Sequence, residues 1–172
     1  MDKRRHLATE TGLYTPDVFE VLLNYETTRI KRYPGPLALL HLALGTDNYP
    51  GELKKQAHEA MTSLLNRTLR ASDVPSHYHN EFLILLPATD DEAARTVAER
   101  ILSTYRTAPD LAGRTASAPN VYVGLTSQNG GSMLSPKHLL AEAAAALDEA
   151  RLSQSSNYVA YSDLARENPG NQ

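Results

Sequence analysis

Stretches of unbroken hydrophobic sequence alternate with stretches in which hydrophobic residues recur every three or four positions. Residues 37–44 and 82–86 are apolar almost throughout, which is typical of strands covered on both faces. The spacing of three and four between these runs predicts amphipathic helices. The helices are predicted at about 15–32, 52–69, 90–105 and 135–150, and the strands at 37–44, 74–78, 81–86, 121–125 and 157–161.

The order of these elements predicts the fold class. A two-residue turn at His79-Asn80 would join two strands into a hairpin. A central sheet of about five strands flanked by helices buries every hydrophobic face, so we expect one α/β (α+β) domain. We assign residues 1–10 to a basic lead-in that could be a linker stub, 11–163 to the domain and 164–172 to a flexible tail, with the longest irregular connection at 107–119.

Composition narrows the class of protein. The chain has 172 residues, a net charge of −3 and no cysteine. The charge argues against a nucleic-acid partner, and the lack of cysteine excludes disulfides and thiolate metal sites. The longest apolar run, 36–44, is far too short to cross a membrane, and the N-terminus lacks a signal-peptide pattern. We therefore expect a cytoplasmic protein with no direct membrane insertion.

Several short motifs occur in an order and at spacings that resemble one known family. They are Thr11-Gly12-Leu13 with Phe19, Pro36 to Leu40, Arg70-Ala-Ser-Asp73, Glu81-Phe82 leading to Pro87, Ala146-Leu147 with Ala150-Arg151, and Asn157. Together they resemble the GGDEF domain, the diguanylate cyclase fold, along nearly the whole chain. The resemblance implies a GGDEF/nucleotidyl-cyclase-like sheet and a place in bacterial cyclic di-GMP signal transduction.

The resemblance also implies that the catalytic residues are missing. Diguanylate cyclases join two GTP molecules with the help of a divalent metal, which carboxylate oxygens hold. The family's two first-strand carboxylates fall here on Ala43 and Gly45. Its signature falls on Tyr78-His79-Asn80-Glu81-Phe82, which keeps neither glycine and has Asn80 in place of the metal-binding acid. We therefore expect a degenerate domain with no catalytic residues, no metal site and no cofactor; magnesium would be needed only if cyclase activity persists.

One ligand site of the family matches better. Arg70 and Asp73 fit the R-x-x-D motif, which in intact members binds cyclic di-GMP. Arginine can hold a phosphate or a guanine edge at two points. Helix capping alone would also place an arginine at a helix end and an aspartate in the following turn. Arg67 and Arg95 are candidates for a second arginine at such a site.

The histidines suggest a rival hypothesis. His77, His79 and Glu81 follow one another at a spacing of two, and His41 on a neighbouring strand could complete a tetrahedral metal site. A turn at His79 would break this alternation. The alternative is a hairpin with partly exposed histidines and a hydrogen-bonded His41 in the core, while His58 and His138 are expected on helix surfaces.

We therefore predict a catalytically inactive GGDEF-like signalling domain that binds cyclic di-GMP or GTP and regulates a pathway. One alternative is a nucleotide-independent module that contacts a protein partner or forms a homodimer, with an exposed apolar patch where the active site had been. A second alternative is a cyclase that works through Glu81 and Asp47.

Overall fold

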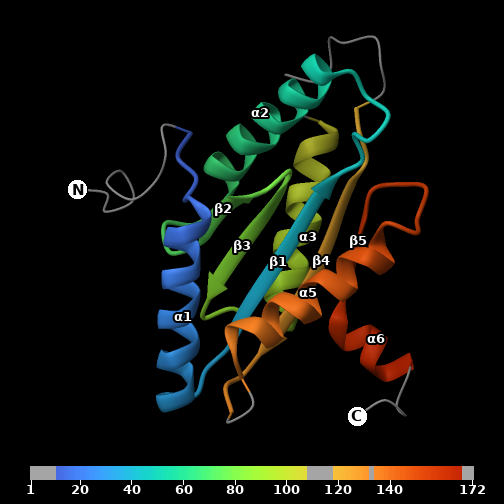
Figure 1. The fold of residues 1–172 in the computed structure, drawn as a ribbon. Helices are drawn as coiled ribbons and strands as arrows, with labels where there is room; N and C mark the ends of the chain where they lie inside the picture. Colours follow the sequence, from blue (N-terminus) through green and yellow to red (C-terminus); the bar gives the residue numbers. More distant parts are fainter. Residues whose placement is uncertain (1–10, 108–117, 132–133, 168–172) are drawn as a thin grey trace.

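The computed structural model describes residues 11–107, 118–131 and 134–167 (Figure 1). The predicted lead-in and most of the predicted irregular connection lie outside these residues. The elements are α1 (Pro16–Arg32), β1 (Leu37–Leu44), α2 (Gly51–Thr68), β2 (Val74–Tyr78), β3 (Glu81–Pro87), α3 (Asp91–Arg106), β4 (Val121–Gln128), α5 (Pro136–Ala150), β5 (Asn157–Ala160) and α6 (Tyr161–Glu167).

The strands form one sheet in the order β2-β3-β1-β4-β5. Only the β4–β5 pair is parallel; the other three pairs are antiparallel. The predicted sheet of about five strands and the predicted hairpin between β2 and β3 are confirmed. The central strand β1 is buried at every position, as its unbroken hydrophobic sequence predicts.

Helices cover both faces of the sheet (Figure 1). Because successive strand residues point to opposite sides, the strands divide their side chains between two cores. Leu40 and Phe82 belong to the core under α2 and α3, whereas Leu39 and Leu83 belong to the core under α1 and α5. We call these sides the α2–α3 face and the α1–α5 face.

Gly124 lets α5 lie directly against β4. A Cβ atom at this position would come within 2.2 Å of the Ala143 carbonyl oxygen and of the Leu147 backbone nitrogen. Both atoms belong to the helix backbone, so no side-chain movement could make room for it. The glycine therefore sets the short distance between helix and sheet.

Two element boundaries differ from the sequence prediction. Strand β4 continues to Gln128, three residues past the predicted end at 125. The short helix α6 was not predicted, and it includes 164–167 of the expected flexible tail; 168–172 lie outside the described residues. None of the α6 residues is buried, so the helix leaves no hydrophobic periodicity in the sequence. In the part of the chain that the structure describes, no helix combines the length and the hydrophobicity needed to span a membrane.

Candidate functional site

A cavity of about 530 Å³ opens between the end of β1, the first turns of α2, the tip of the β2–β3 hairpin and the end of α5. The chain ends of several elements meet here, so polar side chains from distant parts of the sequence share one space. Its lining consists of Ala43, Leu44, Gly45, Thr46, Asp47, Lys54, Lys55, His58, His79, Asn80, Glu81, Tyr122 and Arg151.

Glu81 lies at the centre of the polar groups. The β1–β3 register pairs His41 with Leu83, which places Glu81 two residues along on the same face of the sheet as His41. The His41 Nε2 atom contacts one carboxylate oxygen of Glu81, and Arg151 at the end of α5 donates to the other. The ring of Tyr78 meets the His41 ring edge-on, with the centroids 5.8 Å apart. Both oxygens of the retained signature carboxylate are therefore occupied by side chains of the protein itself.

Burial decides the protonation of His41. Desolvation lowers its pKa below the usual 6.5, although the Glu81 carboxylate and its hydrogen bond act in the opposite direction. The side chain is about 10% exposed. The prediction of a buried, hydrogen-bonded His41 is confirmed.

The positions of the family's first-strand carboxylates offer no ligand atoms. Ala43 is buried, and a Cβ atom at Gly45 would already lie 3.2 Å from the Tyr122 ring. Asn80 also lines the cavity, so Asp47 is the one lining carboxylate besides Glu81. Within 11–107, 118–131 and 134–167, no three His, Asp or Glu side chains are grouped so that they could hold a metal ion. The donor set at this cavity does not fit the divalent metal that cyclase chemistry requires.

The rival metal set is not brought together. Its spacing of two would need one continuous strand, but the chain reverses at His79, so Glu81 pairs with Tyr78 and Phe82 pairs with His77. Paired residues of a hairpin share a face, and His77 therefore lies on the α2–α3 face while Glu81 and His41 lie on the α1–α5 face. The hypothesis failed because the turn exchanges the faces.

The R-x-x-D segment at the foot of the hairpin closes a tight turn. The Arg70 backbone N–H donates to Asp73 Oδ2 at 2.7 Å, and the Asp73 backbone N–H donates to the Arg70 carbonyl at 3.1 Å. Asp73 is buried, whereas the Arg70 side chain is exposed. The aspartate thus serves the backbone, and the arginine is presented to solvent.

Comparison with known proteins places this geometry in a family. A family model described as "Diguanylate cyclase, GGDEF domain" matches residues 55–157, which is more than half of the chain. The chain belongs to the GGDEF family. Comparison with curated protein sequences gives no significant match.

Solved GGDEF structures share the fold. The coiled coil and GGDEF domain of DgcB from Caulobacter crescentus, in complex with c-di-GMP, matches with a TM-score of 0.78 at 16% identity over 92% of this chain and 87% of that one. The diguanylate cyclase SiaD from Pseudomonas aeruginosa, in complex with its activator SiaC, matches with a TM-score of 0.78 at 25% identity over 92% of this chain and 63% of that one. An active GGEEF domain from Vibrio cholerae matches with a TM-score of 0.72 at 16% identity over 82% and 92% of the two chains.

The GGDEF signature of this domain therefore lies at the hairpin tip. His79 occupies the position of the second glycine and has a φ of 55°, in the left-handed region that glycine adopts most easily. Tyr78 occupies the first glycine position and is 36% exposed. Of these two side chains, His79 lines the cavity, whereas Tyr78 contacts the His41 ring.

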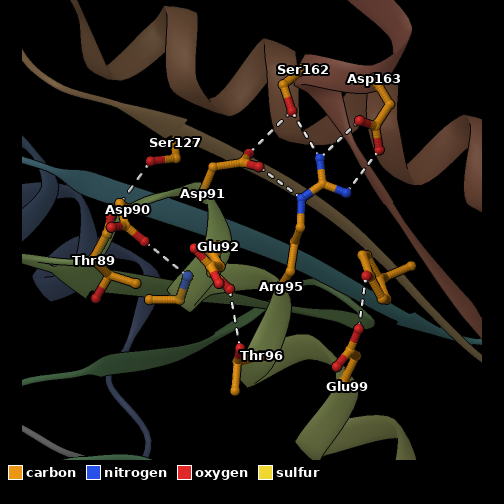
Figure 2. A network of polar contacts seen from close by, with 12 residues as sticks. Thr89, Asp90, Asp91, Glu92, Arg95, Thr96, Glu99, Ser127, Ser162 and Asp163 are labelled. Atoms are coloured by element: carbon orange, nitrogen blue, oxygen red, sulfur yellow. Dashed lines mark hydrogen bonds and ion pairs between the residues drawn. The ribbon is translucent and has the colours of Figure 1, made fainter.

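The two arginines considered as partners for Arg70 have different surroundings. Arg95 is fully engaged: its guanidinium donates to Asp91 at 2.7 Å, to both oxygens of Asp163 at 2.9 Å and to Ser162 at 3.0 Å (Figure 2). This cluster ties α6 to the start of α3, so Arg95 serves the fold. Arg67 is exposed and lines a separate groove on α2.

Sequence reasoning missed Arg100. Its Nε and Nη2 atoms are buried and have no hydrogen-bond partner among the described residues. They border a cavity of about 610 Å³ between α3 and β5, where the Oδ1 atom of Asn157 also lacks a partner. Thr96, Arg100 and Ser103 follow a helical spacing that is typical of an ordinary solvated face, so no local pattern indicates that guanidinium nitrogens of Arg100 lack partners.

The helix histidines were predicted on the surface, and one of them is not. His138 is largely exposed, as predicted, and pairs with Glu142 at 3.5 Å. His58 is half-buried and stacks on Phe82 with ring centroids 5.3 Å apart. The stacking arises because Phe82, the last residue of the signature, points to the α2–α3 face.

Proposed function

We propose that this GGDEF-family domain does not synthesise cyclic di-GMP and acts as a regulatory domain that binds it. The observation that carries the proposal is the occupation of Glu81 by His41 and Arg151 in a cavity without other signature carboxylates. Each carboxylate oxygen of Glu81 already accepts a side-chain donor, so a metal ion at this place would have to share the oxygens with His41 and Arg151 or displace them. Without a metal, nothing in the cavity would neutralise the phosphates and activate an attacking hydroxyl.

Binding of cyclic di-GMP is proposed at Arg70. Its exposed side chain extends from a turn that the buried Asp73 carboxylate holds in place. A guanidinium anchored in this way can donate two parallel hydrogen bonds to a phosphate. The relative DgcB was solved in complex with c-di-GMP, which supports this ligand class. A cytoplasmic location is part of the same proposal.

The first experiment tests catalysis. Purified protein is incubated with GTP and magnesium or manganese, with the Vibrio cholerae GGEEF domain as the active control. We expect neither cyclic di-GMP nor pyrophosphate. Product that disappears in Glu81→Gln and in Asp47→Asn would instead establish the alternative of an active cyclase.

The second experiment tests binding. Calorimetry with cyclic di-GMP, GTP and GDP should show saturable binding of cyclic di-GMP. Arg70→Ala should weaken it roughly tenfold to a hundredfold, because one charged hydrogen-bonding contact is worth about 1.5–3 kcal/mol. Arg166→Ala, which removes an exposed arginine from α6, is the matched control and should leave binding unchanged.

Arg100→Ala extends this test to the unpaired guanidinium. Weaker cyclic di-GMP binding in this variant would assign Arg100 to the same site as Arg70, and unchanged binding would separate the two. Unchanged binding in Arg70→Ala, or no binding by the wild type, would contradict the binding proposal while leaving the catalytic test intact.

The nucleotide-independent alternative predicted an apolar patch at the former active site. The cavity there is polar, with Lys54, Lys55 and Arg151 in its lining, so no such patch is found at this place. Among the large exposed hydrophobic side chains of the described residues, Tyr78 lies at the hairpin tip and is 36% exposed, and the others lie elsewhere: Val21, Tyr25, Tyr33 and Leu152.

A further inference from the structure

Helix α1 exposes two large hydrophobic side chains on its outer side. The helix buries Phe19, Leu23 and Ile30 against the α1–α5 face. At 100° per residue, Val21 and Tyr25 lie opposite these three, and they are 66% and 64% exposed. Helix α1 stands at the edge of the domain (Figure 1). Ordinary surface helices carry polar residues there.

The exposed hydrophobic residues belong to a longer stripe. Val18, Val21, Tyr25, Thr28 and Arg32 follow one another at spacings of three, four, three and four. This is the spacing of the seam between two paired helices. Val18 is partly buried and packs against the core, so the stripe is anchored to the domain at this end.

The charges along α1 would complement those of a second α1 helix that runs in the opposite direction. Asp17 is exposed near the beginning, and Lys31 and Arg32 are exposed at the end. Glu26 and Arg29 form an ion pair at 2.7 Å, so their opposite charges neutralise each other. An antiparallel second copy would set the acidic beginning of one helix on the basic end of the other, whereas a parallel copy would set like charges together.

We propose that this stripe is a homodimer contact in which α1 of one chain packs antiparallel on α1 of a second copy. The two-fold axis passes near the middle of the helix, so that Val21 of one chain meets Tyr25 of the other. Such an interface is isologous, because the same patch serves both chains. This contact is independent of the cavity at the hairpin tip and of cyclic di-GMP binding.

Sedimentation of the full chain over a range of concentrations tests the contact. A single pair of helices gives a small interface, so we expect a weak dimer that dissociates on dilution. Val21→Glu combined with Tyr25→Glu should weaken dimerisation at least about tenfold. Leu152→Glu is the matched control, because Leu152 is 75% exposed but lies outside α1, and it should have no effect. A wild type that stays monomeric at about 1 mM overturns the proposal.

Disulfide cross-linking tests the orientation of the two helices. The chain has no cysteine of its own, so only the introduced cysteines can form disulfides. Val18→Cys and Thr28→Cys are mixed and oxidised, because this two-fold axis sets residue 18 of one chain opposite residue 28 of the other. The two positions are about 15 Å apart along one helix, so an antiparallel pair should give the mixed disulfide and almost no homodisulfide. Predominant homodisulfides, or mixed disulfides that persist unchanged in the Val21→Glu, Tyr25→Glu background, would reject the antiparallel contact.

Charge exchange gives a further check that folding defects cannot imitate. Asp17→Arg should weaken the dimer, and Asp17→Arg together with Arg32→Asp should restore it. Failure of the double variant to recover, while its circular dichroism matches the wild type, would also count against the proposal.

Discussion

The two faces of the sheet are built from the same strands but differ in chemistry. On β3, β1 and β4, the α2–α3 face is apolar at every position within 82–86, 38–44 and 121–125. The α1–α5 face carries buried polar groups, and residues of α5 or its end supply their partners. Thr126 donates to Glu142 at 2.5 Å, and Arg151 reaches Glu81.

This difference explains where the candidate site lies. A closed hydrophobic face can stabilise the fold but cannot recognise a ligand. On the α1–α5 face, the polar side chains of Glu81 and Thr126 have hydrogen-bond partners within the protein. This side of the sheet is therefore a folded and internally paired polar layer.

The largest expected effect concerns neighbouring residues of β1. Leu40 is fully buried on the α2–α3 face, and Leu40→Ala should lower the free energy of unfolding by about 3 kcal/mol through the cavity it leaves. His41→Ala changes the opposite face and should cost roughly 1–2 kcal/mol, mainly through the lost hydrogen bond. Urea denaturation measures both. Equal losses would remove the distinction between the faces.

Gly124→Ala should have the next largest effect. The added methyl group meets the backbone of α5, so the helix must move away from β4, at a cost of about 2 kcal/mol. Amide exchange should quicken in α5 more than in α3. Gly51→Ala is the control, because no atom lies within 4 Å of the added Cβ, and it should leave stability unchanged or slightly higher. If Gly124→Ala left both stability and amide exchange unchanged, the distance between α5 and β4 would not be fixed by this glycine.

The histidines make stability sensitive to acid. Burial lowers the pKa of His41, His58 and His77 below 6.5 in the folded chain. The unfolded chain therefore binds more protons below pH 6.5, and stability should fall as pH drops through this region until the folded pKa values are reached. Glu81→Gln removes the carboxylate charge that does most to raise the His41 pKa, so the NMR titration of His41 should move to lower pH. A shift to higher pH would contradict the pairing of His41 with Glu81.

The smallest loss of stability is expected at Arg95, which lies outside both cores of the sheet. Arg95→Ala breaks the cluster with Asp91 and Asp163, but all three side chains are partly exposed. Solvent and salt screen such pairs, so we expect a loss of about 1 kcal/mol that shrinks at high salt. Thermal unfolding at two salt concentrations tests this. A loss as large as that of Leu40→Ala would mean that α6 supports the core.

The sequence predicted the elements better than their contacts. Hydrophobic spacing located β1 and the hairpin because burial of a strand or helix face is a local pattern. The partners of Glu81 could not be predicted, because His41 and Arg151 are 40 and 70 residues away in the sequence. Strand register brings His41 to Glu81, and the position of α5 brings Arg151. The same register separated His77 from Glu81. Arg100 was missed because nothing in its local sequence shows that its guanidinium lacks a partner.

The left-handed backbone conformation of His79 affects the energy of the hairpin turn. A non-glycine residue at this φ carries strain of roughly 1 kcal/mol, so His79→Gly should make the turn more stable. The main chain at the tip is thus already shaped for glycine. A glycine at position 79 would therefore lower the backbone energy of the turn without any change in its path.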